Sequence, residues 1–338
     1  GSVSGGATYA HGTIAPLTAT PEEGYSFSGW TVDGEPYEGG PEIGLEMTAP
    51  RTALASFNLN QYALETSAGT GGSVSGGGTY DHGETVTISA IPEEGYGFSG
   101  WTVDGEPYEG GLEISLEMTG PRTATAGFTL NQYALETSAG TGGSVSGAGT
   151  YAHGTTAQLT ATPEDGYSFS GWTVDGEPYE GGVEIGLEMT GPRTATAGFT
   201  LNQYALETSA GAGGAVSGGA TYDHGTIAQL TATPEEGYTF AGWTVDGQAY
   251  EGGPEIGLEM TAPRTALASF TLKQYELTTS SGVGGRVDSG VTYDHGETVT
   301  ISAMPEDGYT FAGWTVDGEP YEGGVEISLE MTGPRSAL

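Results

Sequence analysis

One histidine recurs along the chain and is the first residue to consider for catalysis. It lies in "YAHG" or "YDHG", and the adjacent acid is replaced by alanine in two of the five copies, at Ala10 and Ala152. A Ser-His-Asp system needs its carboxylate in every working copy, and a lone histidine without cysteine does not make the usual zinc site. We interpret the histidines as turn residues and predict no enzyme. They are His11, His82, His153, His224 and His295.

Clustered acids are the second candidate, as calcium ligands. Calcium prefers six to eight oxygen ligands, and several carboxylates of one copy flank two turns. The D-x-D-x-D-G loop is absent, however, and the fourth copy has Gln248-Ala249 where the others have Glu-Pro. Calcium is therefore a weak candidate beside diffuse counterion screening, and no other cofactor or metal is predicted. The candidate ligands are Glu93, Glu94, Asp104, Glu106 and Glu109.

Aromatic residues recur in the segment "GYSFSGWTVDGEPYEGG" and its copies. Asp-Gly is a strong signal for a two-residue hairpin, so the rings before it are expected on a strand of the core. A tyrosine after each hairpin leaves sugar stacking as an alternative; these are Tyr37, Tyr108, Tyr179, Tyr250 and Tyr321. The predicted core aromatics are Trp30, Trp101, Trp172, Trp243, Trp314, Phe98, Phe128 and Tyr96.

The spacing of these residues indicates a tandem repeat. Successive tryptophans are 71 residues apart, as are successive histidines. The apolar residues alternate with polar ones up to Asn131-Gln132, and after this pair they occupy the other set of alternate positions. Since such a shift of one residue changes which face is buried, we place a boundary there. We expect a window cut from a longer array. Its units are a partial repeat at 1–59 lacking its first strand, complete repeats at 60–130, 131–201 and 202–272, and a partial repeat at 273–338 lacking its last strand.

Short alternating segments within each unit predict strands. "ETVTISAIP" and "VEIGLEMT" alternate apolar and polar residues, and glycine-rich turns separate such segments. No segment predicts a helix, so the expected fold is all-β, with 71-residue modules of six to seven short strands. Only Asn-Gln joins successive units, which predicts a rod-like array.

The order of the motifs resembles a known family. "Y-x-L…G-G-x-V…V-x-I-x-A-x-P-x-x-G-Y-x-F-x-G-W…R-T-x-x-A-x-F" is similar to the divergent InlB B-repeat, an internalin-type module of bacterial surface proteins. The resemblance covers the whole chain. It implies a β-grasp-like module used as a stalk, spacer or adhesive element, and no catalytic residues. A small sandwich is the alternative fold for such short strands.

Charge limits the possible partners. The chain has 44 acidic and 7 basic residues, a net charge of -37, and no cysteine. Such a surface repels nucleic acid and anionic membranes. No apolar run is long enough for a membrane helix, so no direct membrane insertion is expected in this segment. The expected partners are neighbouring repeats of the same chain, and other copies in a fibre.

These observations together predict a non-enzymatic structural array. We expect it to be extracellular or at a bacterial cell surface, as the stalk or fibre of a surface protein or adhesin. Two alternatives stay open: a subunit of a self-assembling extracellular filament, and an adhesive module that binds glycan or calcium.

Overall fold

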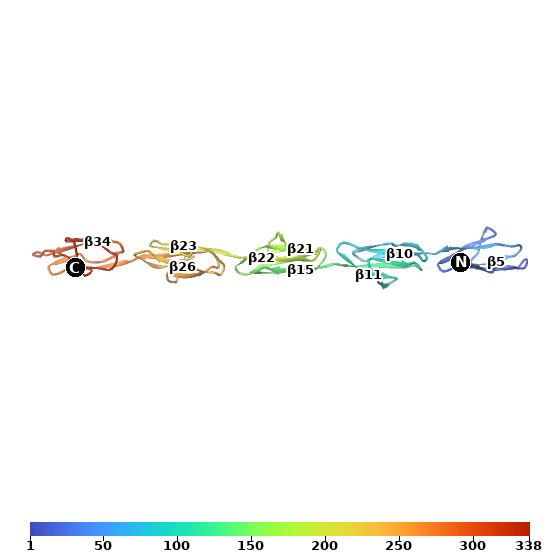
Figure 1. Cartoon of the computed structure of the whole chain (residues 1–338), viewed down its shortest axis with the longest axis horizontal. Helices are drawn as coiled ribbons and strands as arrows, with labels where there is room; N and C mark the ends of the chain where they lie inside the picture. The colour runs from blue at the N-terminus through green and yellow to red at the C-terminus, as the bar shows by residue number, and fades with distance from the viewer. The chain divides into compact units, whose positions relative to one another are not determined.

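The computed structural model describes all residues from 1 to 338 and consists of strands and turns, with no helix (Figure 1). Contacts divide the chain into two compact units. The first comprises Gly1–Ser138, Val145–Thr160 and Thr173–Thr196, and the second comprises the remainder. The second repeat lies in the first unit and the fourth repeat in the second. No segment forms a helix that could span a membrane.

The second repeat has eight strands in two sheets. One sheet has five strands in the order β12-β11-β14-β7-β9, and the other has three in the order β13-β10-β8. The strands are β7 (Gln61–Ala68), β8 (Gly72–Ser75), β9 (Gly78–Asp81), β10 (Thr85–Pro92), β11 (Tyr96–Val103), β12 (Glu106–Tyr108), β13 (Glu113–Glu117) and β14 (Arg122–Leu130).

The other repeats follow the same order of strands. The fourth has β23 (Gln203–Ala210), β24 (Gly214–Ser217), β25 (Ala220–Asp223), β26 (Ile227–Pro234), β27 (Tyr238–Val245), β28 (Gln248–Tyr250), β29 (Glu255–Glu259) and β30 (Arg264–Leu272). The third has β15 (Gln132–Ala139), β16 (Gly143–Ser146), β17 (Gly149–Ala152), β18 (Thr156–Pro163), β19 (Tyr167–Val174), β20 (Glu177–Tyr179), β21 (Glu184–Glu188) and β22 (Arg193–Leu201).

The last repeat keeps this order with several shorter strands, whereas the first has six strands in two three-stranded sheets. The first has β1 (Ser2–Ser4), β2 (Ile14–Thr20), β3 (Tyr25–Val32), β4 (Glu35–Tyr37), β5 (Glu42–Glu46) and β6 (Ala53–Leu59). The last has β31 (Gln274–Thr279), β32 (Gly285–Val287), β33 (Thr292–Asp294), β34 (Thr298–Pro305), β35 (Trp314–Val316), β36 (Glu319–Tyr321), β37 (Glu326–Glu330) and β38 (Arg335–Ala337).

Two details of the predicted strands are corrected. A complete repeat has eight strands and not six or seven, because β9 and β12, of four and three residues, are too short to show an alternating pattern. The last repeat was predicted to lack its last strand, yet Arg335–Ala337 forms β38. Three residues directly after the Gly-Pro turn are enough for parallel pairing with β31, where Leu277 lies opposite Arg335.

A β-bulge brings two aromatic residues of β11 to the same face of the sheet. Phe98 lies opposite Phe128 and Gly100 opposite Gly127, so Ser99 is the extra residue. In a regular strand, residues three apart point to opposite faces, but the bulge shifts the alternation by one. The rings of Phe98 and Trp101 therefore meet, with centroids 5.8 Å apart.

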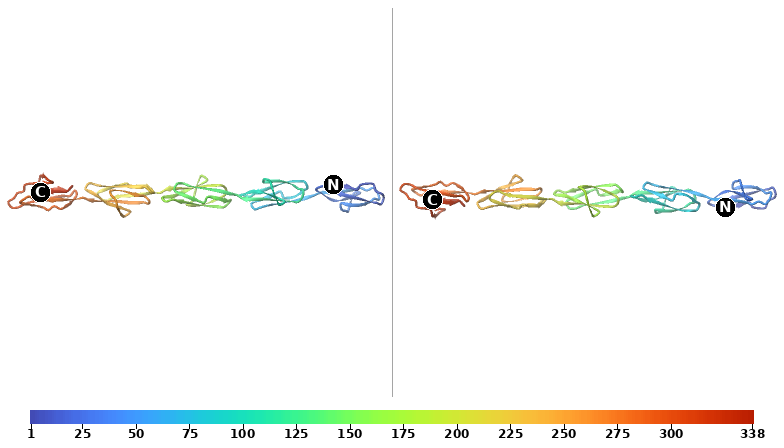
Figure 2. Two further views of the ribbon diagram at one scale, coloured as in Figure 1. Left: turned by 90° about the horizontal axis from the view of Figure 1, so that it is seen from below. Right: turned by 90° about the horizontal axis from the view of Figure 1, so that it is seen from above.

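The core lies between the two sheets. The three-stranded sheet contributes Ile88 and Leu116, and the five-stranded sheet contributes Leu64, Trp101 and Ala126, each at most 3% exposed. Of the two expected architectures, the small sandwich describes the repeat, because a β-grasp fold needs a helix and the chain has none. Figure 2 shows from two further sides that every repeat consists of strands and turns alone.

Candidate functional sites at the turns and repeat junctions

The Asp-Gly hairpin of each repeat is tied to the start of the last strand. Asp104 and Gly105 have φ of 53° and 86°, as a type I′ turn requires. Asp104 Oδ1 accepts a hydrogen bond from the Thr123 N–H at 2.9 Å, and Oδ2 accepts one from Arg122 Nε at 2.8 Å. The equivalent acid–arginine pairs are Asp33–Arg51, Asp175–Arg193, Asp246–Arg264 and Asp317–Arg335.

These hydrogen bonds change the acidity of the hairpin aspartate. The Thr123 N–H, and to a smaller extent the Arg122 guanidinium, hold the pKa of Asp104 below its ordinary value, against a partial desolvation that raises it. The anion is thus the form that the fold stabilises. Its role in the structure is to fasten the hairpin between β11 and β12 to the first residues of β14.

The candidate calcium ligands are not gathered around one point. Asp104 is engaged by Arg122, and the four glutamates are exposed side chains at separate turns. No group of three or more histidine, aspartate or glutamate side chains is placed to hold a metal ion. The glutamates in question are Glu93 and Glu94 before β11, and Glu106 and Glu109 at β12.

The tryptophan of each repeat lies in the core, 2–3% exposed. Trp101 Nε1 donates a hydrogen bond to the Gly111 carbonyl at 2.8 Å, so burial leaves no indole donor unpaired. Phe98 and Phe128 pack edge to face at 6.2 Å beside it. Tyr96 differs from the expectation: it lies half-buried against Gly71 and outside the core cluster, because it is the first residue of β11 at the end of the sandwich.

The tyrosine that follows each hairpin is 36–39% exposed. Tyr108 lies opposite Trp101 on β12, the edge strand of the five-stranded sheet. The Tyr179 hydroxyl is 3.5 Å from the Gly186 carbonyl, so the ring leans over its own repeat. A single half-exposed ring per repeat is a small platform for a sugar, and glycan binding stays a prediction.

The junction between repeats is a packed contact. Only Asn131 separates β14 from β15. The Asn131 N–H donates to the Gly95 carbonyl of the preceding repeat at 2.8 Å, and the His153 N–H donates to the Asn131 carbonyl at 2.9 Å. The His153 ring lies on Gly95, so closely that a Cβ there would overlap the ring, and Tyr133 packs edge to face on its other side at 6.0 Å.

The histidine contact is repeated at every junction in the chain. The partners are His82 on Gly24, His153 on Gly95, His224 on Gly166 and His295 on Gly237. In each ring Nδ1 is buried without a hydrogen-bond partner. In the fourth repeat the other ring nitrogen, His224 Nε2, lies 3.6 Å from the Asp165 carboxylate of the preceding repeat.

The histidine's contact with the preceding repeat is the feature that sequence reasoning missed. The sequence pattern indicates only that this histidine is a turn residue of its own repeat. One signal was available: "EGY" or "DGY" recurs at the histidine's own interval, and its glycine has no evident partner inside the unit. That glycine receives the ring of the next repeat.

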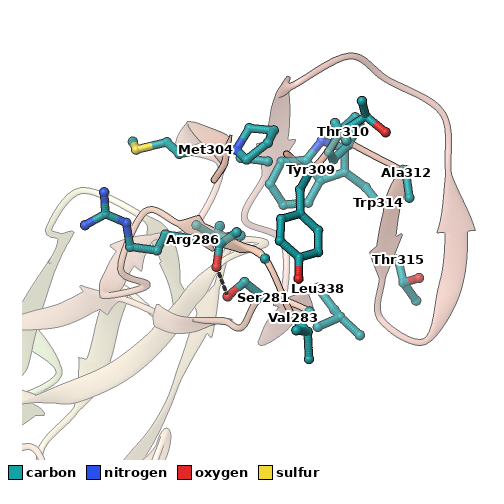
Figure 3. Close-up of a pocket in the computed structure, with 18 residues that line it drawn as sticks. Ser281, Val283, Arg286, Met304, Tyr309, Thr310, Ala312, Trp314, Thr315 and Leu338 are labelled. Carbon is teal, nitrogen blue, oxygen red and sulfur yellow. Dashed lines mark hydrogen bonds between the residues drawn. The ribbon is translucent and has the colours of Figure 1, made fainter. Parts of the chain in front are cut away.

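The fifth repeat contains a cavity of about 310 Å³ (Figure 3). Tyr309, Trp314 and Leu338 line it, and the Ser281 hydroxyl donates to the Gly285 carbonyl at its rim. In the second repeat Phe128 of β14 fills the corresponding place against Phe98.

Together these features define a class: a tandem β-repeat protein whose small sandwiches are tied to one another by short junctions. The divergent InlB B-repeat domain matches five consecutive segments, 1–61, 62–132, 133–203, 204–274 and 275–336. The chain belongs to this family. The matched segments begin about two residues later than the units predicted from the alternation.

Two curated relatives come from Evansella cellulosilytica. A "Putative Gly-rich membrane protein" is 24% identical over 302 residues, covering 88% of this chain and 35% of the relative. A "Putative membrane protein" is 26% identical over 162 residues, covering 47% of this chain and 24% of the relative. The chain thus spans about a third or less of the relatives it matches.

Two solved structures show weak likeness. The Bacillus anthracis TIE protein has a TM-score of 0.35 and 8% identity, over 97% of this chain and 70% of that one. The major pilin protein of Streptococcus pyogenes has a TM-score of 0.13 and 15% identity, over 78% and 98%. Neither contributes to the description of the fold above.

Proposed function

We propose that this chain is a non-enzymatic, extracellular array that serves as the stalk of a bacterial surface protein. Each repeat adds a fixed increment of length, and its partners are the repeats before and after it. Membership of a family of surface-associated repeats and the names of the two membrane-protein relatives support a surface location.

The observation that carries the proposal is the junction. A single residue joins consecutive sandwiches, and both its N–H and its carbonyl are hydrogen-bonded. The histidine ring of each repeat also covers a glycine of the preceding repeat. A flexible tether would have a long glycine- and serine-rich segment with free backbone groups. Restricted motion between neighbours is what a stalk requires.

Charge provides a second support. The second repeat, 60–130, has ten acids and one arginine, a net charge of -9. Neighbouring repeats of like charge repel one another within the Debye length of about 8 Å at physiological salt. Repulsion opposes the folding of one repeat back onto the next, so it acts in the same direction as the junction.

Double electron–electron resonance, which measures the distance between two spin labels, tests the stiffness of one junction. Because the chain has no cysteine, Thr87→Cys and Gln158→Cys introduce two unique labelling sites at equivalent exposed positions of the second and third repeats. We expect a single narrow distance distribution. The same pair in the Gly95→Ala variant should give a broader one, since the added methyl displaces His153.

A broad distribution in the unaltered junction would contradict the stalk. It would indicate repeats that move independently, as modules on tethers do.

The surface location needs a separate measurement. Antibodies raised against the chain should label intact cells of the source bacterium, and labelling only after lysis would overturn that part of the proposal.

A further inference from the structure

One edge of the five-stranded sheet is unusual in the fourth repeat. β12, β20 and β36 have the sequence Glu-Pro-Tyr, as does β4 of the first repeat, and each lies at the edge of its sheet. β28 reads Gln248-Ala249-Tyr250 and occupies the same edge position. The fourth repeat has therefore lost both the acid and the proline of its edge strand.

At the proline position of the hairpin, the backbone nitrogen and carbonyl face away from the neighbouring strand. In a two-residue hairpin the flanking residues, Val103 and Glu106, exchange the backbone hydrogen bonds, so the next residue on each strand does not bond across the pair. Pro107, opposite Thr102, thus directs its nitrogen and carbonyl to the open side. Proline is tolerated there because no hydrogen bond to β11 is lost.

Ala249 occupies the position of the proline in the fourth repeat, but its backbone can donate a hydrogen bond. It lies opposite Thr244, as Pro107 lies opposite Thr102, so its N–H and carbonyl face the open side of β28. Unlike proline, it has an N–H to donate. An incoming extended segment can therefore form a closely spaced pair of hydrogen bonds with Ala249, which none of the other four edge strands can offer in full.

Proline and charge are two of the means by which edge strands resist the addition of another strand. Pro107 removes the donor, and the exposed Glu106 makes the approach unfavourable for an acidic chain. In β28 the charge is absent as well, because Gln248 is neutral and exposed. For a basic segment the acid is no obstacle, so the missing proline, at one place only among the five hairpins, is what opens this edge.

We propose that β28 is a docking edge for an extended, positively charged polypeptide segment, which adds as a strand beside Ala249. Backbone hydrogen bonds would provide the attachment, as in other complexes formed by strand addition. The surroundings favour a basic occupant over a second copy of this chain, since the net charge of -37 repels a copy.

Two side chains beside Ala249 suit a basic segment. The Tyr250 ring is 38% exposed and can accept a cation on its face. Glu251 follows directly and is exposed, without an ion pair in the structure. The nearby Asp246 already pairs with Arg264, so Glu251 is the acid that remains for an incoming lysine or arginine.

The probe for this proposal is a ten-residue peptide of alternating arginine and threonine with blocked ends, titrated into the full chain at 150 mM NaCl. Isothermal titration should show one site that is at least about tenfold weaker in the Ala249→Pro variant, a difference of about 1.4 kcal/mol. This substitution changes no charge, and proline occupies the equivalent position in four repeats, so folding should be retained.

A reciprocal variant and an altered peptide sharpen the test. Glu177→Gln with Pro178→Ala opens the edge of β20 in the third repeat and should create a second site of similar affinity. A peptide with the same charges but N-methylated at every residue, so that neither of its edges keeps a free N–H, should lose the preference for the unaltered chain, because it cannot pair as a strand.

Three results would overturn the proposal. Equal binding to the unaltered chain and to Ala249→Pro would mean that only the overall charge attracts the peptide. Equal binding of the methylated peptide would mean the same. Concentration-dependent dimerisation without peptide, abolished by Ala249→Pro in analytical ultracentrifugation, would show that a second copy occupies the edge and that the basic partner is wrong.

Discussion

The His82 imidazole lies directly on Gly24 of the preceding repeat, and the two residues are linked a second time through Asn60. The Asn60 N–H donates to the Gly24 carbonyl at 2.7 Å, and the His82 N–H donates to the Asn60 carbonyl at 2.8 Å. The histidine ring and one backbone hydrogen bond thus meet at Gly24, and a second backbone hydrogen bond ties the histidine to Asn60. The same arrangement at all four junctions makes this pair the repeated connection of the array.

We predict that Gly95→Ala weakens the junction between the second and third repeats. Gly95 has φ of 81°, and an added Cβ would overlap the ring of His153. Gly83→Ala is a matched control, since Gly83 has φ of 79° and nothing near its missing Cβ. Both variants should lose about 1 kcal/mol through backbone strain, and Gly95→Ala about 1 kcal/mol more. Urea unfolding measures the difference.

A double variant isolates the ring contact. His153→Ala removes the ring that the new methyl would strike, so Gly95→Ala combined with His153→Ala should be no less stable than His153→Ala with Gly83→Ala. If Gly95→Ala and Gly83→Ala destabilise the chain equally, the contact between histidine and glycine adds nothing beyond the backbone requirement.

The hairpin aspartates predict sensitivity to acid. The Thr123 N–H first, and Arg122 second, lower the folded-state pKa of Asp104. The other four aspartates have the equivalent backbone N–H and arginine of their own repeats, with Ser336 as the backbone donor to Asp317. A lowered folded-state pKa gives stability that is present above the unfolded pKa of about 3.9 and is lost as pH falls through the folded value. We therefore expect the stabilisation contributed by these five aspartates to be present above about pH 4 and to be lost as the pH falls through their lowered folded-state pKa values.

Asp104→Asn tests this assignment. Asparagine tolerates the positive φ of the turn and keeps one oxygen for the Thr123 N–H, so the backbone is not disturbed. We expect a loss of only about 0.5–1 kcal/mol at pH 7, because the pair is largely exposed, and a smaller loss at pH 2.5, below the ordinary pKa of the carboxyl group. Equal losses at both values of pH would show that the carboxylate charge is unimportant.

The repeat length, the buried tryptophan and the hairpin could be predicted from sequence because short segments encode them. Asp104-Gly105 requires no distant partner to turn, and the alternation in Thr85–Pro92 indicates a strand by itself. The parallel pairing of Leu64 with Arg122 could not be predicted, since it joins residues 58 apart and neither strand's pattern records its neighbour.

The contacts between repeats escaped prediction for a related reason. The surface of Gly95 is open within its own repeat, and only the folded next repeat places His153 on it. Likewise the bulge at Ser99 changes which side of β11 faces the core, and a strict period of two cannot reveal it. The sequence pattern describes strands, whereas these features depend on how strands meet.

Core packing predicts a large difference between two methionine substitutions. Met118 is fully buried, and Met304 is 46% exposed. Met118→Ala should destabilise the second repeat by about 2–5 kcal/mol through lost burial and a cavity, whereas Met304→Ala should change stability by less than about 0.5 kcal/mol. Calorimetry should show a separate early transition for Met118→Ala, with an enthalpy of roughly 50 kcal/mol for one repeat of this length. A uniform shift of the entire transition would show that the repeats unfold as one unit.

The net charge of -37 predicts that salt stabilises the array. Raising NaCl from 10 to 150 mM shortens the Debye length from about 30 to 8 Å and weakens repulsion among the exposed carboxylates. We expect the unfolding midpoint to rise by roughly 5 °C, which is about 1 kcal/mol for a domain of this size.

Two charge-matched variants then separate screening from an ordered calcium site. Glu93→Gln with Glu94→Gln removes two candidate ligands, and Glu113→Gln with Glu117→Gln removes two exposed acids elsewhere in the same repeat. CaCl2 should raise the unfolding midpoint as NaCl does. Under diffuse screening both pairs of substitutions should reduce this rise equally, because each removes two charges. If only the first pair abolishes it, and calorimetry of the unaltered chain shows stoichiometric calcium, then those carboxylates form a site and diffuse screening is the wrong account.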